Sequence, residues 1–181
     1  MHKRLDDKTT ELVQIIGEKH VFGFDKDTLA GVVGRLLNEK SLTLSVAESC
    51  TGGNIAHLVT SVPGSSVYFK GSVTAYANEI KTQIIGVKET DINSFGAVSE
   101  PVVQQMASGI KKIFKTDYSI ATSGIAGPDG GTPEKPIGIT WIAIGTPDKL
   151  ISRKYLLGDH RERNITKASL IALNMLRNSL L

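Results

Sequence analysis

The sequence predicts an α/β protein, a three-layer α/β/α sandwich built around a mixed β-sheet. Segments with strand periodicity alternate with amphipathic helices over most of the chain, which is the pattern of such domains. Two polar turns directly follow predicted strands, and ligands of open α/β sheets bind beyond the carboxyl ends of strands. The length of 181 residues suits one domain with little left over.

The first 25 residues are predicted to be an extension that precedes the domain proper, which spans residues 26–181. Residues 8–18 carry apolar side chains at helical spacing and predict a short amphipathic helix. Residues 19–25 are then interpreted as a linker.

The first half of the domain begins with a predicted helix over residues 26–39. Gly31 and Gly34 weaken this helix, and their small size favours close packing. The short apolar run 42–47 predicts a buried strand. A helix over residues 54–62 follows, and a Pro-Gly pair ends it.

The middle of the chain is rich in β-branched and aromatic residues over positions 66–76, which predicts a second strand. Asn78 is expected to cap the next helix, which runs to Ile85 and ends at Gly86. Ser99 is expected to cap a further helix that has a proline in its first turn.

The C-terminal part contains a third predicted strand over residues 118–122, which enters the glycine-rich run 124–131. Segments 137–144 and 150–157 are predicted to form an antiparallel pair of strands. The last helix is expected over residues 160–178, where apolar residues recur at helical spacing.

Bulk properties exclude several classes of protein. The net charge is +3 and aromatic residues make up 6% of the chain, so there is no basic stripe with stacking aromatics of the kind that binds nucleic acid. No apolar run is long enough to span a membrane, and the N-terminus has no signal-peptide core. The single cysteine cannot form an internal disulfide. We therefore expect a cytoplasmic protein that acts on a small molecule.

The first candidate site is the junction Glu-Ser-Cys-Thr-Gly-Gly, which connects a predicted strand to a helix. A serine at such a turn, here Ser49, can point its hydroxyl into a crevice. Gly52 and Gly53 permit unusual dihedral angles, and the N–H groups from Thr51 to Gly53 can bind an oxyanion or a phosphate. A simple capped turn without catalytic function also fits this pattern.

A serine nucleophile needs a base, and lysine serves in Ser–Lys variants of the triad. Tyr76, Asn78 and Lys81 cluster at the next strand-to-helix junction. Asn78 and Lys81 are three residues apart and can share a helix face. The positive helix end, together with burial in the crevice, would lower the pKa of the lysine. The alternative is a solvated surface lysine next to a capping asparagine.

Other groups remain open as alternatives. Cys50 is a rival nucleophile, because a thiol at a helix N-terminus can have a lowered pKa. Glu48 and His57 are further candidates for the base. No His, Cys and carboxylate cluster has zinc-ligand spacing, so no metal is expected, although a loose carboxylate site for magnesium stays open.

The run from Gly124 to Gly131 is not a P-loop, because no Gly-Lys-Ser/Thr follows it. Its density of glycine and proline exceeds what a turn needs, which favours a ligand loop lined by backbone. Arg161 and Arg163 come at the start of the last helix, where either could reach an anionic ligand or face solvent.

Four strings occur in order along the chain: AESCTGG, TAYANEIK, GAVSEPVV and SGIAGPDGGTPEKPIG. Together they resemble the CinA C-terminal-domain family over the range from about Leu29 to the end. The resemblance implies an α/β/α fold and hydrolysis of the amide of nicotinamide mononucleotide to nicotinate mononucleotide and ammonia. It further implies a role in pyridine-nucleotide recycling, no cofactor and a homodimer. The segment before Leu29 looks like the connector found in longer, two-domain members.

The resemblance implies catalytic roles for Ser49, Tyr76 and Lys81. An arginine of the family's GDR motif corresponds to Arg161, within a GDHR stretch that departs from the motif by one residue. The residues expected to bind substrate are Thr51, Gly52, Gly53, Asn78, Ser123, Gly124, Gly127 and Arg161. The rival hypothesis is a non-catalytic module that binds a nucleotide or a protein partner, as the family's association with competence and DNA damage suggests.

Overall fold

The computed structural model describes residues 2–17 and 20–181, with side chains from residue 8 onward. Five strands form one mixed sheet in the order β2-β1-β3-β4-β5. Their bounds are β1 Leu44–Glu48, β2 Phe69–Thr74, β3 Tyr118–Gly124, β4 Ile139–Gly145 and β5 Leu150–Leu156. The first three strands run parallel, whereas β4 is antiparallel to both of its neighbours. The expected mixed sheet and its antiparallel C-terminal pair are confirmed.

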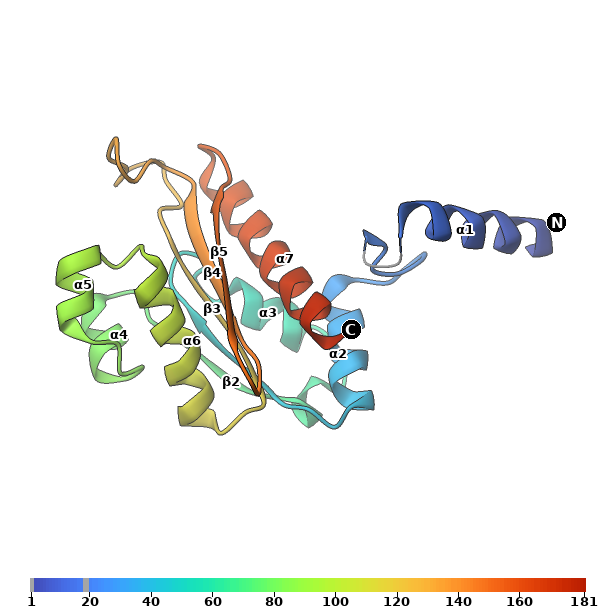
Figure 1. Ribbon diagram of the computed structural model, residues 1–181, viewed down its shortest axis with the longest axis horizontal. Coiled ribbons are helices and arrows are strands. Elements are labelled where there is room, and N and C mark those ends of the chain that lie inside the picture. Colours follow the sequence, from blue (N-terminus) through green and yellow to red (C-terminus); the bar gives the residue numbers. More distant parts are fainter. Residues whose placement is uncertain (1, 18–19) are drawn as a thin grey trace.

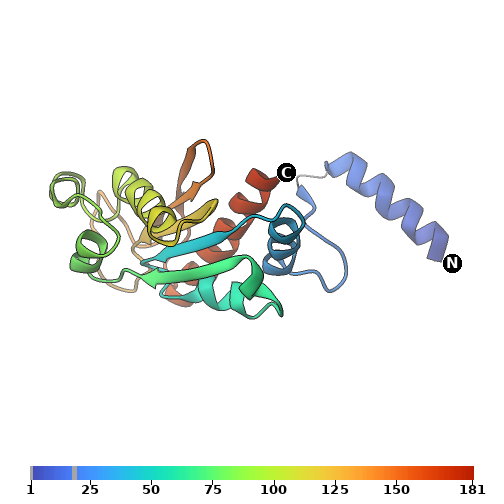
Figure 2. The ribbon, with the colours of Figure 1, turned by 90° about the horizontal axis from the view of Figure 1, so that it is seen from below.

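Helices cover both faces of this sheet, as Figures 1 and 2 show, and give the predicted three layers. One face carries α2 (Leu29–Glu39), α3 (Asn54–Thr60) and α7 (Arg161–Leu180). The other face carries α4 (Asn78–Gln83), α5 (Glu89–Phe95) and α6 (Glu100–Phe114). Each face has its own apolar core, and side chains such as Val46 and Ala47 alternate between the two. Because β1 lies between β2 and β3 and helices cover both faces of the sheet, all five of its residues are buried.

The structure corrects several expected boundaries. The helix predicted over 26–39 starts at Leu29, because the Thr28 hydroxyl accepts the N–H of Gly31 and caps it. The strand predicted over 66–76 divides into a 3-10 turn, η2 (Ser65–Val67), and β2. Helix α5 was not predicted, because Ile92 is its one buried residue and an amphipathic pattern is missing. The other elements differ from expectation by a few residues at their ends.

Two expected helix caps are wrong in their chemistry. Ala77, not Asn78, is the N-cap of α4, and Asn78 is already helical. Ser99 does occupy the N-cap of α6, but its hydroxyl donates to the carbonyl of Gly96 instead of accepting a helix N–H. Both helices are therefore started by their packing and, in α6, by a proline in the first turn.

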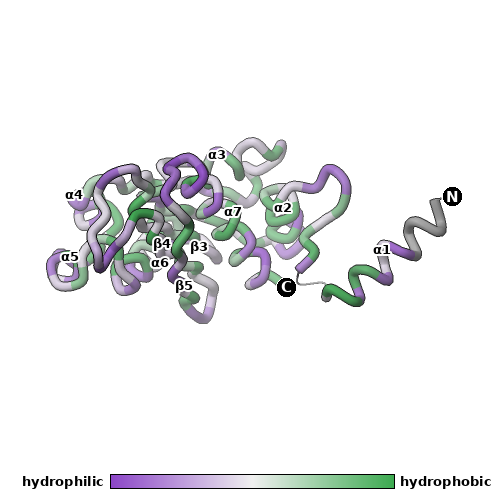
Figure 3. Tube along the Cα trace, turned by 90° about the horizontal axis from the view of Figure 1, so that it is seen from above, coloured by the Kyte–Doolittle hydropathy of each residue, from purple (hydrophilic) through white to green (hydrophobic). Residues whose placement is uncertain are grey.

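The N-terminal helix α1 (His2–Ile16) stands apart from the sheet and its helices. It begins earlier than predicted, and Glu18, the predicted end, lies outside the described residues. Leu12, Ile15 and Ile16 are exposed on it, and its last turn is the apolar part in Figure 3. No described helix has the length and apolar character that crossing a membrane requires.

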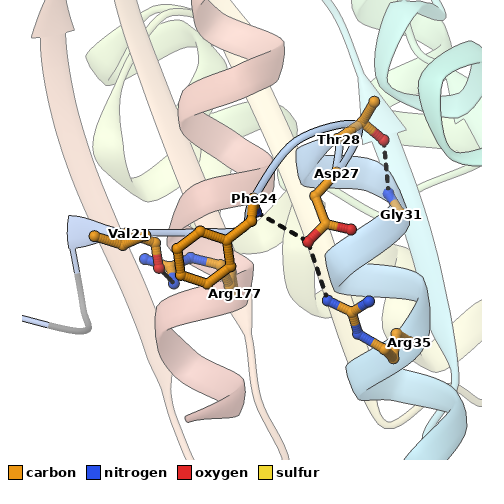
Figure 4. A network of polar contacts seen from close by, with 7 residues as sticks. All are labelled: Val21, Phe24, Asp27, Thr28, Gly31, Arg35 and Arg177. Carbon is orange, nitrogen blue, oxygen red and sulfur yellow. Dashed lines mark hydrogen bonds and ion pairs between the residues drawn. The ribbon is translucent and has the colours of Figure 1, made fainter. Parts of the chain in front are cut away.

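The predicted linker is held against the domain by the polar contacts in Figure 4. The buried guanidinium of Arg177, near the end of α7, donates to the carbonyl of Val21 at 3.2 Å. The Asp27 carboxylate accepts the N–H of Phe24 at 3.2 Å and lies 3.6 Å from Arg35. The chain is thus fixed to the domain from Val21 onward, ahead of the first residue of α2.

Candidate active site

The carboxyl ends of three parallel strands bring the predicted site residues to one edge of the sheet. Glu48 at the end of β1 pairs in register with Thr74 of β2 on one side and Thr122 of β3 on the other. Ser49 and Tyr76 follow the first two of these ends, and Ser123 lies at the end of β3. This convergence is the crevice that the strand order of an open α/β sheet creates.

A cavity of about 240 Å³ lies at this edge. It is lined by Ser49, Cys50, Tyr76, Asn78, Lys81, Ala97, Val98, Ser123, Gly124, Ala126 and Arg161. Seven of these had been predicted as site residues. A larger hollow of about 750 Å³ lies between the linker and α7, but no serine, cysteine or lysine lines it. The smaller cavity is the one at the carboxyl ends of the parallel strands, where open α/β sheets bind their ligands.

The turn between β1 and α3 holds Ser49 at the floor of the cavity. Its N–H donates to the carbonyl of Thr122 at 3.1 Å, which fixes the residue to β3. Gly53 caps α3 with a φ of 99°, a left-handed conformation that favours glycine. In the described part of the chain no group hydrogen-bonds to the Ser49 hydroxyl, so this oxygen is free to react.

Glu48 caps α3 from within the sheet. Its buried carboxylate accepts the N–H groups of Gly53 at 3.1 Å, Ile55 at 3.0 Å and Ala56 at 2.8 Å. A carboxylate so engaged neutralises the positive end of the helix, so the structure assigns Glu48 to folding and not to proton transfer. The other alternative base, His57, is exposed and does not line the cavity.

These contacts correct the expected oxyanion site. The Gly53 N–H is taken by Glu48, and the Gly52 N–H donates to the carbonyl of Ser49 at 3.1 Å. The hydroxyl of Thr51 is buried and shares a hydrogen bond of 2.8 Å with Thr122. None of the three lines the cavity, so direct substrate contacts by Thr51, Gly52 and Gly53 are not supported.

Lys81 is 2% exposed and reaches the cavity from α4. Its amine donates to the carbonyls of Ala75 at 2.7 Å and Tyr76 at 3.2 Å, and it pairs with no carboxylate among the described residues. Burial lowers the pKa of Lys81 below its ordinary value. Burial was one of the two causes predicted, whereas the positive helix end does not contribute, since Lys81 lies in the last turn of α4.

The two hydrogen bonds of Lys81 suit a neutral amine. An ammonium group has three N–H donors and no lone pair, whereas a neutral amine has two donors and one lone pair. With both donors directed at the carbonyls of Ala75 and Tyr76, the lone pair of a neutral Lys81 remains available. The amine can then accept a proton from a neighbouring hydroxyl.

Cys50 also lines the cavity, but its thiol is a poor nucleophile. Burial raises the pKa of Cys50 to about 12, despite hydrogen bonds that act in the opposite direction. The reactive thiolate is therefore scarce near neutral pH. The rival reading of a cysteine nucleophile is disfavoured by this environment.

Arg161 extends from the start of α7 across the mouth of the cavity. Its guanidinium donates to the carbonyl of Gly127 at 2.8 Å and to the hydroxyl of Tyr76 at 3.0 Å. The one-residue departure in the GDHR stretch thus does not keep this arginine out of the cavity. Gly127 and Arg163 do not line the cavity, but the Gly127 carbonyl accepts the hydrogen bond from Arg161.

Two further predicted site residues, Ser123 and Asn78, differ in whether their side chains are hydrogen-bonded. The Ser123 hydroxyl donates to the carbonyl of Ala97 at 2.7 Å, which joins β3 to the segment before α6. Asn78 lines the cavity and makes no side-chain hydrogen bond within the described chain. Ala97, Val98 and Ala126 were missed as lining residues, although the strings that contain them had been noted. No group of three or more His, Cys, Asp and Glu residues in the described chain could hold a metal ion.

Comparisons with known proteins identify the family of the chain. The model of the CinA C-terminal domain family matches residues 26–180. A CinA-like protein from Cytophaga hutchinsonii is 48% identical over 163 residues, which are 90% of this chain and 39% of the relative. A CinA-like protein from Thermotoga maritima is 43% identical over 97% of this chain and 43% of its own length. The chain therefore spans about two fifths of the length of these relatives.

Solved structures show the same fold. The competence/damage inducible protein CihA from Agrobacterium tumefaciens superposes with a TM-score of 0.81 at 34% identity, covering 88% of this chain and 98% of that one. A competence-damaged protein (CinA) superfamily protein from Klebsiella pneumoniae has a TM-score of 0.81 at 30% identity, covering 84% of this chain and 95% of its own.

Proposed function

Because the chain belongs to the CinA C-terminal domain family, we propose that it hydrolyses the carboxamide of nicotinamide mononucleotide to nicotinate mononucleotide and ammonia, with Ser49 as nucleophile and Lys81 as base. One observation carries the proposal above all. A buried lysine that forms no salt bridge among the described residues lines the same small cavity as a serine hydroxyl that has no hydrogen-bond partner there. A non-catalytic binding module has no need for this combination.

The reaction follows from these two groups. The lone pair of neutral Lys81 takes the hydroxyl proton while the Ser49 oxygen bonds to the carboxamide carbon. The tetrahedral intermediate collapses, its C–N bond breaks, and the proton held by Lys81 passes to the departing nitrogen as ammonia leaves. Water then attacks the acyl ester, Lys81 accepts one of its protons, and that proton returns to the Ser49 oxygen as the ester bond breaks.

Other lining residues supply binding in this proposal. Asn78 has a free amide that can donate to the carboxamide oxygen, a contact that replaces the oxyanion donors expected at Gly52 and Gly53. Arg161, held with Tyr76 at the mouth of the cavity, provides the positive charge for the ribose phosphate. Tyr76 carries its hydroxyl on the same side and can relay a proton to the departing ammonia.

Ammonia release from nicotinamide mononucleotide by the purified chain tests the proposal. We expect turnover by the native chain and a loss of several orders of magnitude in Ser49→Ala. Ser61→Ala removes an exposed hydroxyl that bonds only to the carbonyl of Leu58 and is the matched control. Hydroxylamine should intercept the acyl ester as a hydroxamate. A folded native chain that binds the nucleotide but releases no ammonia would establish the binding-module alternative instead.

A further inference from the structure

Asn164 is a buried amide close to the cavity for which the proposed reaction has no use so far. It lies in the first turn of α7, three residues after Arg161, and is 2% exposed. Its side-chain nitrogen donates to the carbonyls of Ala126 and Gly158, both at 3.0 Å. Because both neighbours are carbonyls, the NH₂ group and not the oxygen must face them.

The two acceptors of Asn164 belong to the segments that surround Arg161. Ala126 lines the cavity, and the next residue, Gly127, offers its carbonyl to the Arg161 guanidinium. Gly158 precedes α7 and leads directly into it. The first turn of α7 therefore donates hydrogen bonds to two consecutive carbonyls of the same loop, from Asn164 to Ala126 and from Arg161 to Gly127.

The loop has little freedom to adjust on its own. Gly127 has a φ of 89°, and a Cβ at this position would lie 2.6 Å from Ile137 and 3.3 Å from the carbonyl of Asp159. A shift of Ala126 would therefore move the Gly127 carbonyl and, with it, the guanidinium of Arg161. The position of the arginine depends on how firmly Ala126 is held.

The side-chain amide of Asn164 is satisfied at its nitrogen but not at its oxygen. Its oxygen is buried and has no hydrogen-bond partner in the described chain. A buried acceptor left without a partner is unfavourable, and buried polar atoms of this kind are uncommon. What Asn164 provides is therefore its pair of donors, both of which are directed at the segments that place Arg161.

We propose that Asn164 is a positioning residue that fixes the Ala126–Gly127 segment and thereby holds Arg161 where it meets the anionic part of the substrate. This inference rests on the proposed function, because Arg161 is given its phosphate-binding role there. Asn164 touches no substrate itself. Its influence on the reaction passes through the Gly127 carbonyl and the guanidinium.

The kinetic test compares nicotinamide mononucleotide with nicotinamide riboside, which lacks the phosphate. Asn164→Ala should raise KM for the mononucleotide by about three- to tenfold, as the loss of a hydrogen bond typically does, with kcat nearly unchanged. The riboside should show no such change. The double variant with Arg161→Ala should be no worse than Arg161→Ala alone, because both substitutions remove the same contact.

Asn164→Leu keeps the approximate size of the side chain, removes both donors and adds no charge beside the two carbonyls, so it tests the same contact if the alanine variant folds poorly. Asn174→Ala is the control, since this asparagine lies on the same helix and bonds Arg177 at its far end. Equal losses on both substrates, or effects that add to those of Arg161→Ala, would reduce Asn164 to a structural role and overturn the inference.

Hydrogen exchange of the unliganded chain supplies a readout that does not depend on activity. Asn164→Ala should speed exchange at the amides of residues 125–131, and Asn174→Ala should not. If the native chain releases no ammonia, the proposed function fails. Faster exchange of residues 125–131 in Asn164→Ala would still show that Asn164 holds this loop in place, which we call the clamp. Unchanged exchange there would refute the clamp whatever the kinetics show.

Discussion

Glu48→Gln tests how the turn that carries Ser49 is held. The carboxylate accepts three N–H groups of α3, and one of its oxygens serves both Gly53 and Ile55. A glutamine can keep that oxygen, but its NH₂ group then faces the Ala56 N–H. One charge-assisted hydrogen bond is lost, at about 1.5–3 kcal/mol, together with a charge at the helix start that contributes about 0.3–1 kcal/mol.

The free energy of unfolding of Glu48→Gln should therefore fall by roughly 2–4 kcal/mol, the sum of these two losses. For a chain of this size that corresponds to a decrease in Tm of roughly 4–16 °C. Urea denaturation followed by circular dichroism measures the first quantity, and calorimetry measures the second. Glu89→Gln, which removes an exposed acid in the first turn of α5, is the control; it loses only the charge at a helix start and should change stability by no more than about 1 kcal/mol.

The same variant separates a cap from a base. Folded Glu48→Gln should keep the acidic limb of its pH–rate profile, because a cap contributes no titrating group to the reaction. A variant as stable as the native chain that has lost both its rate and this limb would refute the assignment of Glu48 to folding.

Four further predictions concern Lys81, Cys50 and Gly34. Because burial lowers the pKa of Lys81, kcat/KM should rise with pH through a pKa below the ordinary 10.5, and Lys81→Arg should lose nearly all activity since arginine cannot accept the proton. The native state also binds fewer protons than the unfolded state between the lowered pKa of Lys81 and 10.5, so the free energy of unfolding should rise with pH across that window. Lys81→Met should lose this slope. Urea titrations at several pH values measure it. Cys50→Ala should keep most of kcat, because a thiol with a pKa of about 12 is protonated at neutral pH, and a dead but folded variant would restore the cysteine as nucleophile. Gly34→Ala should destabilise the chain by about 1–2 kcal/mol in thermal unfolding, because its new Cβ meets the buried hydroxyl of Tyr68 and this overpacking outweighs the gain in helix propensity. Adding Tyr68→Phe should restore part of the lost stability.

The sheet and most of its helices could be predicted because each has a local signal. The apolar run that became β1 is buried on both faces, and such runs are typical of central parallel strands. Helix α5 has no such signal, since its sequence is polar and tertiary contacts hold it in place. The start of η2 was missed because β-branched residues also occur in short turns that follow a left-handed glycine, here Gly64.

The sequence predicted which residues gather at the site better than it predicted what each of them does there. Ser49 and Lys81 follow two strands that the sequence predicted within a mixed sheet. The parallel pairing of these strands brings the two residues to the same edge. The burial of Lys81 beneath the carbonyls of Ala75 and Tyr76 depends on packing that no local pattern encodes. The same holds for Glu48, whose carboxylate accepts the Gly53 N–H, one of the groups that were expected to bind an oxyanion. A glutamate at the end of a strand gives no sign that it will fold back onto the next helix.

Helix α7 joins two arginines with separate tasks, and their spacing has a practical consequence for handling the protein. Arg161 lies at the cavity. Arg177 lies 16 residues further along the helix, about 24 Å away, and its guanidinium donates to the main-chain carbonyl of Val21. A fusion partner, a fluorescent label or a surface tether joined through α1 is therefore anchored far from the cavity mouth. Immobilising the protein by its N-terminal end should leave substrate entry unobstructed.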